Sequence, residues 1–152
     1  MQTSLPVPQP ELAVLVGLPG AGKSTFFRAH LAATHALVSK DRFRHNRDRA
    51  RRQRTLVRAA LASGRSVAVD NTNPSRAERA ELLALARAFG ARPVAYLFRP
   101  DLAGCLARNA GREGRERVPD VALYAALARF EAPTPEEGFA AVLAVPSPSL
   151  VS

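Results

Sequence analysis

The chain has 152 residues, of which 47% are hydrophobic and 23% charged, and its formal net charge is +9. The length suits a single domain spanning residues 1–152, and the apolar fraction excludes a disordered chain. No stretch approaches the roughly 18 apolar residues of a membrane-spanning helix, so no membrane contact through such a helix is expected. The first residues lack a signal-peptide pattern and the single cysteine, Cys105, cannot form an internal disulfide, so the sequence predicts a cytoplasmic protein.

Short apolar runs alternate with helical patterns along the chain. The runs predict strands at 12–16, 36–38, 66–69, 93–98 and 139–145. Helices are predicted at 21–33, 48–63, 102–109 and 120–130, and another from the Asn73-Pro74 pair to Gly90, with Asn73 as N-cap and Pro74 at the first position. The Pro-rich ends, about 1–10 and 146–152, are predicted to be irregular. This order predicts an α/β fold with a central parallel sheet flanked by helices on both faces.

Positive charge is concentrated in one segment. Residues 42–58 contain eight arginines and one acidic residue, Asp48, so this segment accounts for +7 of the net charge. One interpretation is a polyanion-binding surface, and the alternative is a solvated helix face.

A glycine-rich segment, Gly17–Ser24 (GLPGAGKS), matches G-x-x-x-x-G-K-[ST] between a predicted strand and a predicted helix. Its backbone N–H groups can surround phosphate oxygens, Lys23 can reach the β- and γ-phosphates, and the Ser24 hydroxyl can bind Mg²⁺. The pattern predicts a P-loop fold with ATP and Mg²⁺ as cofactors. The predicted nucleotide-binding residues are Gly17, Gly20, Ala21, Gly22, Lys23, Ser24 and Thr25.

Two aspartates follow predicted strands. Asp70 ends an apolar run, as a carboxylate that supports Mg²⁺ does, although it could simply cap a turn. Asp41 follows the second strand, which places it at the carboxyl edge of a parallel sheet. There it could accept the proton of an acceptor hydroxyl during phosphoryl transfer, or it could be a capping residue.

An arginine-rich segment at 108–118 (RNAGREGRERV) could close over the nucleotide and bring guanidinium groups to the phosphates. The alternative is a charged surface loop. The residues leave Arg115, Arg117 and Cys105 without an assigned role.

Several of these motifs in combination carry a family resemblance. They are the P-loop, Asp41-x-x-Arg44, the VDNTN run at 69–73, and Cys105-x-x-Arg108-Asn109-x-x-Arg112 followed by Val118-Pro119. From about residue 12 to residue 139 the chain resembles the 5′-kinase domain of polynucleotide kinase–phosphatases. The resemblance implies that Lys23 and Ser24 serve the ATP phosphates and Mg²⁺, with Asp70 supporting the site. It also implies that Asp41 is the general base for a 5′-hydroxyl, that Arg44 engages the acceptor phosphate or holds Asp41, and that Arg112 and Arg108 contact the donor phosphates.

The leading hypothesis is therefore an ATP-dependent kinase acting on a 5′-hydroxyl end of DNA or RNA, because the basic segment begins directly after Asp41. The alternatives are a small-metabolite kinase of the same fold, and a nucleotide-binding ATPase or switch module. The sequence does not distinguish DNA from RNA or ATP from GTP, and it does not give the oligomeric state.

Overall fold

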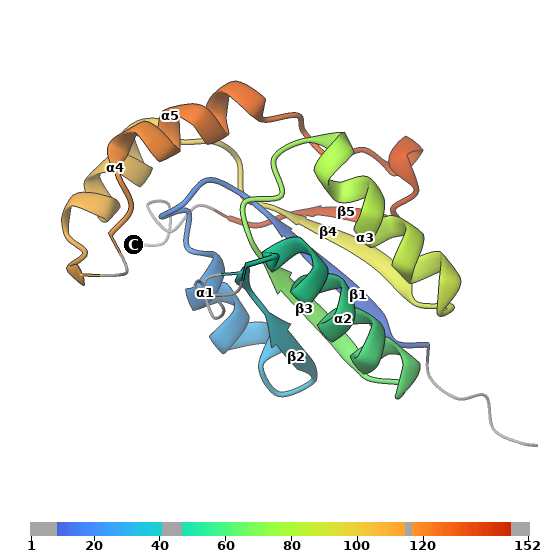
Figure 1. Ribbon diagram of the computed structural model, residues 1–152. Coiled ribbons are helices and arrows are strands. Elements are labelled where there is room, and N and C mark those ends of the chain that lie inside the picture. The colour runs from blue at the N-terminus through green and yellow to red at the C-terminus, as the bar shows by residue number, and fades with distance from the viewer. Residues whose placement is uncertain (1–8, 41–46, 115–116, 147–152) are drawn as a thin grey trace, which may run out of the picture.

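The computed structural model describes residues 9–40, 47–114 and 117–146, and it places a parallel sheet between two layers of helices (Figure 1). The strands are β1 (Glu11–Val16), β2 (His35–Val38), β3 (Ser66–Asp70), β4 (Arg92–Leu97) and β5 (Ala141–Ala144), in the order β2-β3-β1-β4-β5. The helices are α1 (Lys23–Phe26), α2 (Arg49–Ala62), α3 (Arg76–Ala88), α4 (Leu102–Ala110) and α5 (Asp120–Arg129), with a π-helical turn at Phe27–Leu31 and a 3₁₀ turn at Pro135–Glu137. The predicted α/β fold is confirmed, while most of the two Pro-rich ends lies outside the described residues.

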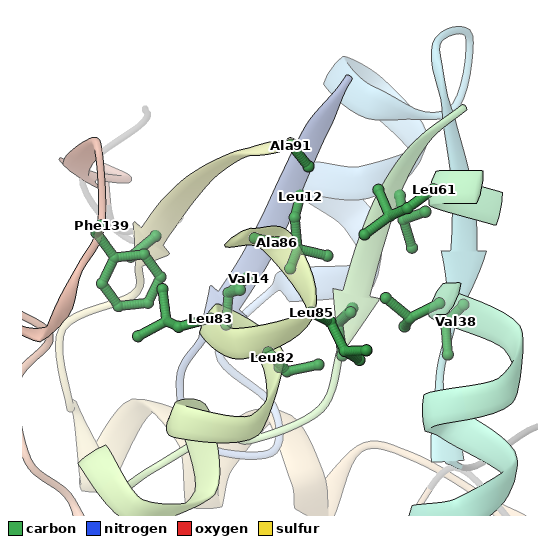
Figure 2. Close-up of a cluster of buried hydrophobic side chains, with 14 of the residues drawn as sticks. Leu12, Val14, Val38, Leu61, Leu82, Leu83, Leu85, Ala86, Ala91 and Phe139 are labelled. Atoms are coloured by element: carbon green, nitrogen blue, oxygen red, sulfur yellow. The ribbon is translucent and has the colours of Figure 1, made fainter. Parts of the chain in front are cut away.

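One face of the sheet is covered by α2 and α3. Figure 2 shows Leu82 and Leu85 of α3 next to Leu12 and Val14 of β1, with Leu61 of α2 farther along the same layer. Each of these side chains is at most 7% exposed. Removing a leucine of this size from water contributes roughly 1.5–3 kcal/mol, so the alternation along β1 fixes which face carries these helices.

The opposite face is covered by the π-helical turn, α4 and α5. Ala13 and Leu15, the residues of β1 that point away from α3, pack in one cluster with Phe27 and Leu31 of the turn and with Leu123 of α5. The helices α4 and α5 pack side by side on this face (Figure 1). Helices on both faces explain why the strands are continuously apolar rather than alternating.

The parallel arrangement gathers the carboxyl ends of the strands at one edge. Leu15 of β1 is in register with Asp70 of β3, and Val69 of β3 is in register with Val38 of β2. The loop beginning at Gly17 therefore lies beside the end of β3. Ligands of open α/β sheets bind at this edge.

The start of α3 differs from the prediction. Its N-cap is Ser75, whose hydroxyl accepts the N–H of Glu78 at 3.2 Å, rather than Asn73. Asn73 instead has a φ of +47° and turns inward, where its Nδ2 donates to the carbonyl oxygen of Leu15 at 2.8 Å. Asparagine tolerates this left-handed conformation better than most residues, so the Asn-Pro pair forms a loop that supports β1.

The helix predicted at 21–33 is shorter and changes type. Gly22 has a φ of +96°, which is incompatible with a right-handed helix, so α1 begins at Lys23. From Phe27 the hydrogen bonds join residues five positions apart instead of four. The N–H of Ala32, for example, donates to the carbonyl oxygen of Phe27 at 2.8 Å. Such π-helical turns occur often near functional sites.

A buried ion pair connects α3 to the 3₁₀ turn. The Arg79 guanidinium is fully buried and donates from Nε to Glu137 Oε1 and from Nη2 to Oε2, both at 2.9 Å. Its Nη1 donates to the carbonyl oxygen of Asn73 at 2.9 Å. The pair thus holds the loop between β3 and α3, whose Thr72 carbonyl oxygen accepts the N–H of Gly17 at 3.1 Å.

A polar cluster occupies the amino edge of the sheet, away from the carboxyl ends. Glu11 Oε2 contacts His35 Nε2 at 2.7 Å and accepts the Tyr96 hydroxyl at 3.0 Å. The hydrogen bond to His35 lowers the pKa of Glu11 from its ordinary value, against the opposing effect of burial. Burial, together with the neighbouring Glu11, raises the pKa of Tyr96 to about 12.

Within the described ranges, no helix combines the length and apolar character needed to cross a membrane.

Candidate functional site

The phosphate-binding loop is held by close backbone packing. A Cβ atom at Gly17 would lie 2.7 Å from Phe98 Cβ, at the end of β4, so only glycine fits there. The N–H of Gly17 donates to Thr72 in the loop after β3, which connects the P-loop to the neighbouring strand. The loop therefore sits between the ends of β3 and β4, as the strand order requires.

Lys23 lies inside this loop. Its Nζ donates to the carbonyl oxygens of Gly17 at 2.5 Å and Leu18 at 3.3 Å, and the residue is only 9% exposed. These contacts place the ammonium group within the curve of the loop, where phosphate oxygens bind in P-loop proteins.

Ser24 and Asp70 form a pair across two elements. The Ser24 hydroxyl at the start of α1 donates to Asp70 Oδ2 at the end of β3 at 2.9 Å. The pair offers only oxygen atoms, which Mg²⁺ prefers, and few enough of them to leave coordination positions for phosphate and water. The donor set therefore fits Mg²⁺.

A cleft of about 1120 Å³ opens at this edge. Of the sequence-predicted residues, those that line it are Gly20, Gly22, Lys23, Ser24, Thr25, Asp70 and Arg112, whereas Gly17, Ala21 and Arg108 do not. Among the described residues, the lining carries six basic side chains and three acidic ones, namely Lys23, Arg28, Lys40, Arg49, Arg112 and Arg129 against Asp70, Glu78 and Glu81. The excess of positive charge suits anionic ligands.

Arg108 contacts the loop rather than the cleft. Its Nε donates to the carbonyl oxygen of Gly20, and one of its terminal nitrogens lies 3.7 Å from Cys105 Sγ. The guanidinium group thus holds the loop backbone against α4, and its predicted phosphate contact stays a prediction.

Asp41, Arg44 and Arg115 lie outside the described residues. The residue before Asp41 in the sequence, Lys40, is described and lines the cleft. On the other side of the gap, Asp48 caps α2, since its side chain accepts the N–H of Arg51 at 2.9 Å.

Sequence reasoning missed two amide side chains of the site. The N–H of Lys40 donates to Asn71 Oδ1 at 2.9 Å, and Asn71 Nδ2 donates to Gln53 Oε1. Both amides line the cleft. A signal for Gln53 was present, because it occupies the same helical stripe as the buried Val57 and Leu61, at intervals of four residues.

The exposed face of α2 carries most of the basic segment that the structure describes. Arg54 pairs with Glu81 of α3 at 2.7 Å. Within the described part of the chain, no ion pair involves the exposed residues Arg49, Arg51, Arg52 and Arg58. Arg49 lines the cleft, so this charged face begins at the cleft and continues along the helix.

Comparison with known proteins agrees with this geometry. A relative from Schizosaccharomyces pombe, named bifunctional polynucleotide phosphatase/kinase, is 31% identical over 144 residues, which cover 90% of this chain and 33% of the relative. The chain thus spans about a third of that protein. A gluconokinase from Sinorhizobium meliloti 1021 superposes with a TM-score of 0.61 at 23% identity, covering 90% of this chain and 82% of that one. A fungal RNA kinase superposes with a TM-score of 0.66 at 15% identity, covering 91% and 39%.

The family model described as AAA domain (AAA_33) matches residues 12–133. That range includes the loop, the Asp70 carboxylate and all strands except β5. Since the match extends over most of the chain, the chain belongs to this AAA domain family, and its fold is that of the solved kinases.

Proposed function

We propose that this kinase transfers the γ-phosphoryl group of ATP to the 5′-hydroxyl end of a polynucleotide. The proposal combines the cleft geometry, the charge on α2 and the likeness to a polynucleotide phosphatase/kinase. The observation that carries it is the arginine face of α2, because a small acceptor would not need charge that continues beyond the cleft.

The nucleotide would bind at the P-loop. The loop N–H groups and Lys23 would hold the phosphates, and Arg112, which lines the cleft from the segment after α4, would approach the transferring phosphoryl group. Ser24 and Asp70 would hold Mg²⁺, which neutralises phosphate charge when it is bound.

The acceptor would enter from the side of β2 and α2. Asp41 would take the proton of the 5′-hydroxyl, and Arg44 would engage the acceptor phosphate or hold Asp41. Support for these roles comes from the family resemblance and from the place of Asp41 in the sequence, directly after the cleft-lining Lys40.

A second candidate is a small-metabolite kinase. Glu78 and Glu81 line the cleft, and carboxylates suit the hydroxyl groups of a sugar better than the phosphates of a nucleic acid. However, Glu81 is paired with Arg54 and Glu78 lies 3.9 Å from Arg129, so both charges have a counterion nearby. Because of this pairing, the two carboxylates would repel a polyanionic acceptor less, so they do not favour a sugar strongly.

An acceptor screen tests the proposal. With labelled ATP, Mg²⁺ and low salt, we expect transfer to 5′-hydroxyl oligonucleotides and none to 5′-phosphorylated ones, sugars, nucleosides or antibiotics. The rate at subsaturating oligonucleotide should fall steeply as salt rises. Transfer to a sugar alone would support the metabolite kinase, and ATP hydrolysis with no acceptor in the whole panel would support a switch module.

Single arginine variants locate the acceptor. Arg51→Ala and Arg58→Ala, each made alone, should raise the oligonucleotide KM and reduce its salt dependence, since a phosphate contact is lost. Arg65→Ala removes an exposed arginine in the turn after α2 and serves as the matched control. An equal effect of Arg65→Ala would indicate that only overall charge matters.

A further inference from the structure

A relay of two amides determines which end of Gln53 is available to a ligand. A backbone N–H can only donate, so the contact with Lys40 requires an oxygen, Oδ1, on that side of Asn71. Asn71 must then present its Nδ2 to Gln53, which accepts with Oε1. The remaining end of Gln53 is therefore the donor, Nε2.

This donor is held in an otherwise enclosed side chain. Gln53 is only 5% exposed and lines the cleft. Among the described residues, Gln53 Nε2 has no hydrogen-bond partner, and Thr134 Oγ1 is the side-chain polar atom that is fully enclosed without one. Gln53 Nε2 thus keeps access to solvent. Since Gln53 lines the cleft, this access is through the cleft. An amide donor that is held in a fixed direction at the wall of the cleft is placed to donate to a ligand oxygen.

The topology places this donor on the acceptor side. Gln53 belongs to α2, which connects β2 to β3, whereas the P-loop follows β1 on the other side of β3. Asn71, which orients Gln53, directly follows Asp70 of the Ser24–Asp70 pair. The donor therefore lies on the β2 side of the site, away from the loop that holds the nucleotide.

We propose that Gln53 Nε2 donates a hydrogen bond to a sugar or phosphate oxygen of the phosphoryl acceptor, and that Asn71 sets the direction of this donor. The identity of the acceptor as a polynucleotide end rests on the proposed function, whereas the role of Gln53 requires only an acceptor with oxygen atoms.

Two isosteric variants test this inference. Gln53→Glu keeps the oxygen that accepts from Asn71 and replaces the donor by a second oxygen. Asn71→Asp keeps the oxygen that accepts from Lys40 and presents an oxygen to Gln53, whose amide must then turn its Nε2 away from the cleft. Each variant should raise the acceptor KM at least about tenfold, because a hydrogen bond to the substrate is replaced by repulsion. The ATP dissociation constant, measured without acceptor, should change less than about twofold.

Gln9→Glu is the matched control, because Gln9 is exposed and donates to the carbonyl oxygen of Gly90 away from the cleft. Thermal unfolding of each variant shows whether the domain still folds. Asn71→Asp leaves Gln53 in place, so its effect cannot come from a carboxylate at position 53. An unchanged acceptor KM in both variants, or a parallel loss of ATP affinity, would overturn the inference.

The same experiment separates the two proposals. If the unaltered kinase phosphorylates a sugar but no oligonucleotide, the proposed function is wrong. The variants are then measured with that sugar, and a selective rise in its KM would still support the role of Gln53.

Discussion

The Ser24 hydroxyl donates to Asp70 Oδ2 at 2.9 Å, although 46 positions separate the two residues in the chain. The contact exists because β1 and β3 are adjacent and in register, so the P-loop and the end of β3 meet at one edge. Two oxygen donors that are far apart in the sequence are brought together only through this adjacency.

Asp70→Asn should weaken Mg²⁺ binding, because the amide retains the shape of the carboxylate without its charge. We expect the Mg²⁺ concentration for half-maximal rate to rise about 10- to 100-fold, with little change in thermal stability. Titration of the transfer rate with Mg²⁺ measures this. Glu136→Gln, at an exposed position of the 3₁₀ turn, is the control, and an unchanged Mg²⁺ dependence of Asp70→Asn would remove Asp70 from the metal site.

Asp41→Ala should abolish transfer without abolishing ATP binding. Loss of a general base lowers the rate by about 100- to 10,000-fold. Single-turnover transfer, together with the ATP dissociation constant, separates the chemical step from binding. If transfer by this variant is unimpaired, Asp41 is not the base.

Arg112→Ala and Arg117→Ala should differ in effect. Arg112 lines the cleft, whereas Arg117 is exposed and does not. We expect Arg112→Ala to reduce kcat by about 100-fold or more, since one charge-stabilising donor is removed, and Arg117→Ala to have little effect. Equal losses would mean that the segment contributes only general positive charge.

Glu11→Gln should lower stability near neutral pH but not in strong acid. The pKa of Glu11 is lowered in the folded state, so its contribution is present above the ordinary value of 4.5 and is lost as the pH falls through the folded-state pKa. We expect a loss of about 0.5–1 kcal/mol near pH 7, allowing for solvent screening. Denaturant unfolding of both proteins across pH measures this, and curves that stay parallel in acid would contradict the assignment.

Arg79→Ala should be strongly destabilising. It leaves the Glu137 carboxylate, 3% exposed, without its counterion, which typically costs about 3–5 kcal/mol. Arg129→Ala, at the exposed pair with Glu78, should cost less than about 1 kcal/mol. Denaturant unfolding compares the two. The pair Arg79→Met with Glu137→Leu should recover much of the loss, and a failure to recover would point to the contacts with Asn73 and with the N–H of Thr134 instead.

The α/β fold with a parallel sheet and the P-loop could be predicted from the sequence because both depend on local patterns. Continuous apolar runs such as residues 67–69 of β3 indicate strands buried on both faces, and the spacing of Gly17, Lys23 and Ser24 is specific. Such signals need no knowledge of distant contacts.

The details that sequence reasoning got wrong or missed depend on long-range contacts. Asn73 resembles a helix cap, yet its amide is taken up by the carbonyl oxygen of Leu15. Arg108 stays a predicted phosphate ligand, but its contact with the carbonyl oxygen of Gly20 could not be read from the sequence. Gln53 shares the buried stripe of α2, which is visible in the sequence, but its contact with Asn71 appears only in the fold.

The buried partner of Arg79 comes from a part of the chain that the family match does not reach. The match ends at residue 133, whereas Glu137 lies four positions further on. A fragment that ends at residue 133 would keep the P-loop and the Asp70 carboxylate. It would leave the Arg79 cation buried without its counterion, against the loop between β3 and α3 that supports the P-loop. We therefore expect the smallest unit that folds stably to extend at least to Glu137, because charge compensation rather than sequence similarity sets its limit.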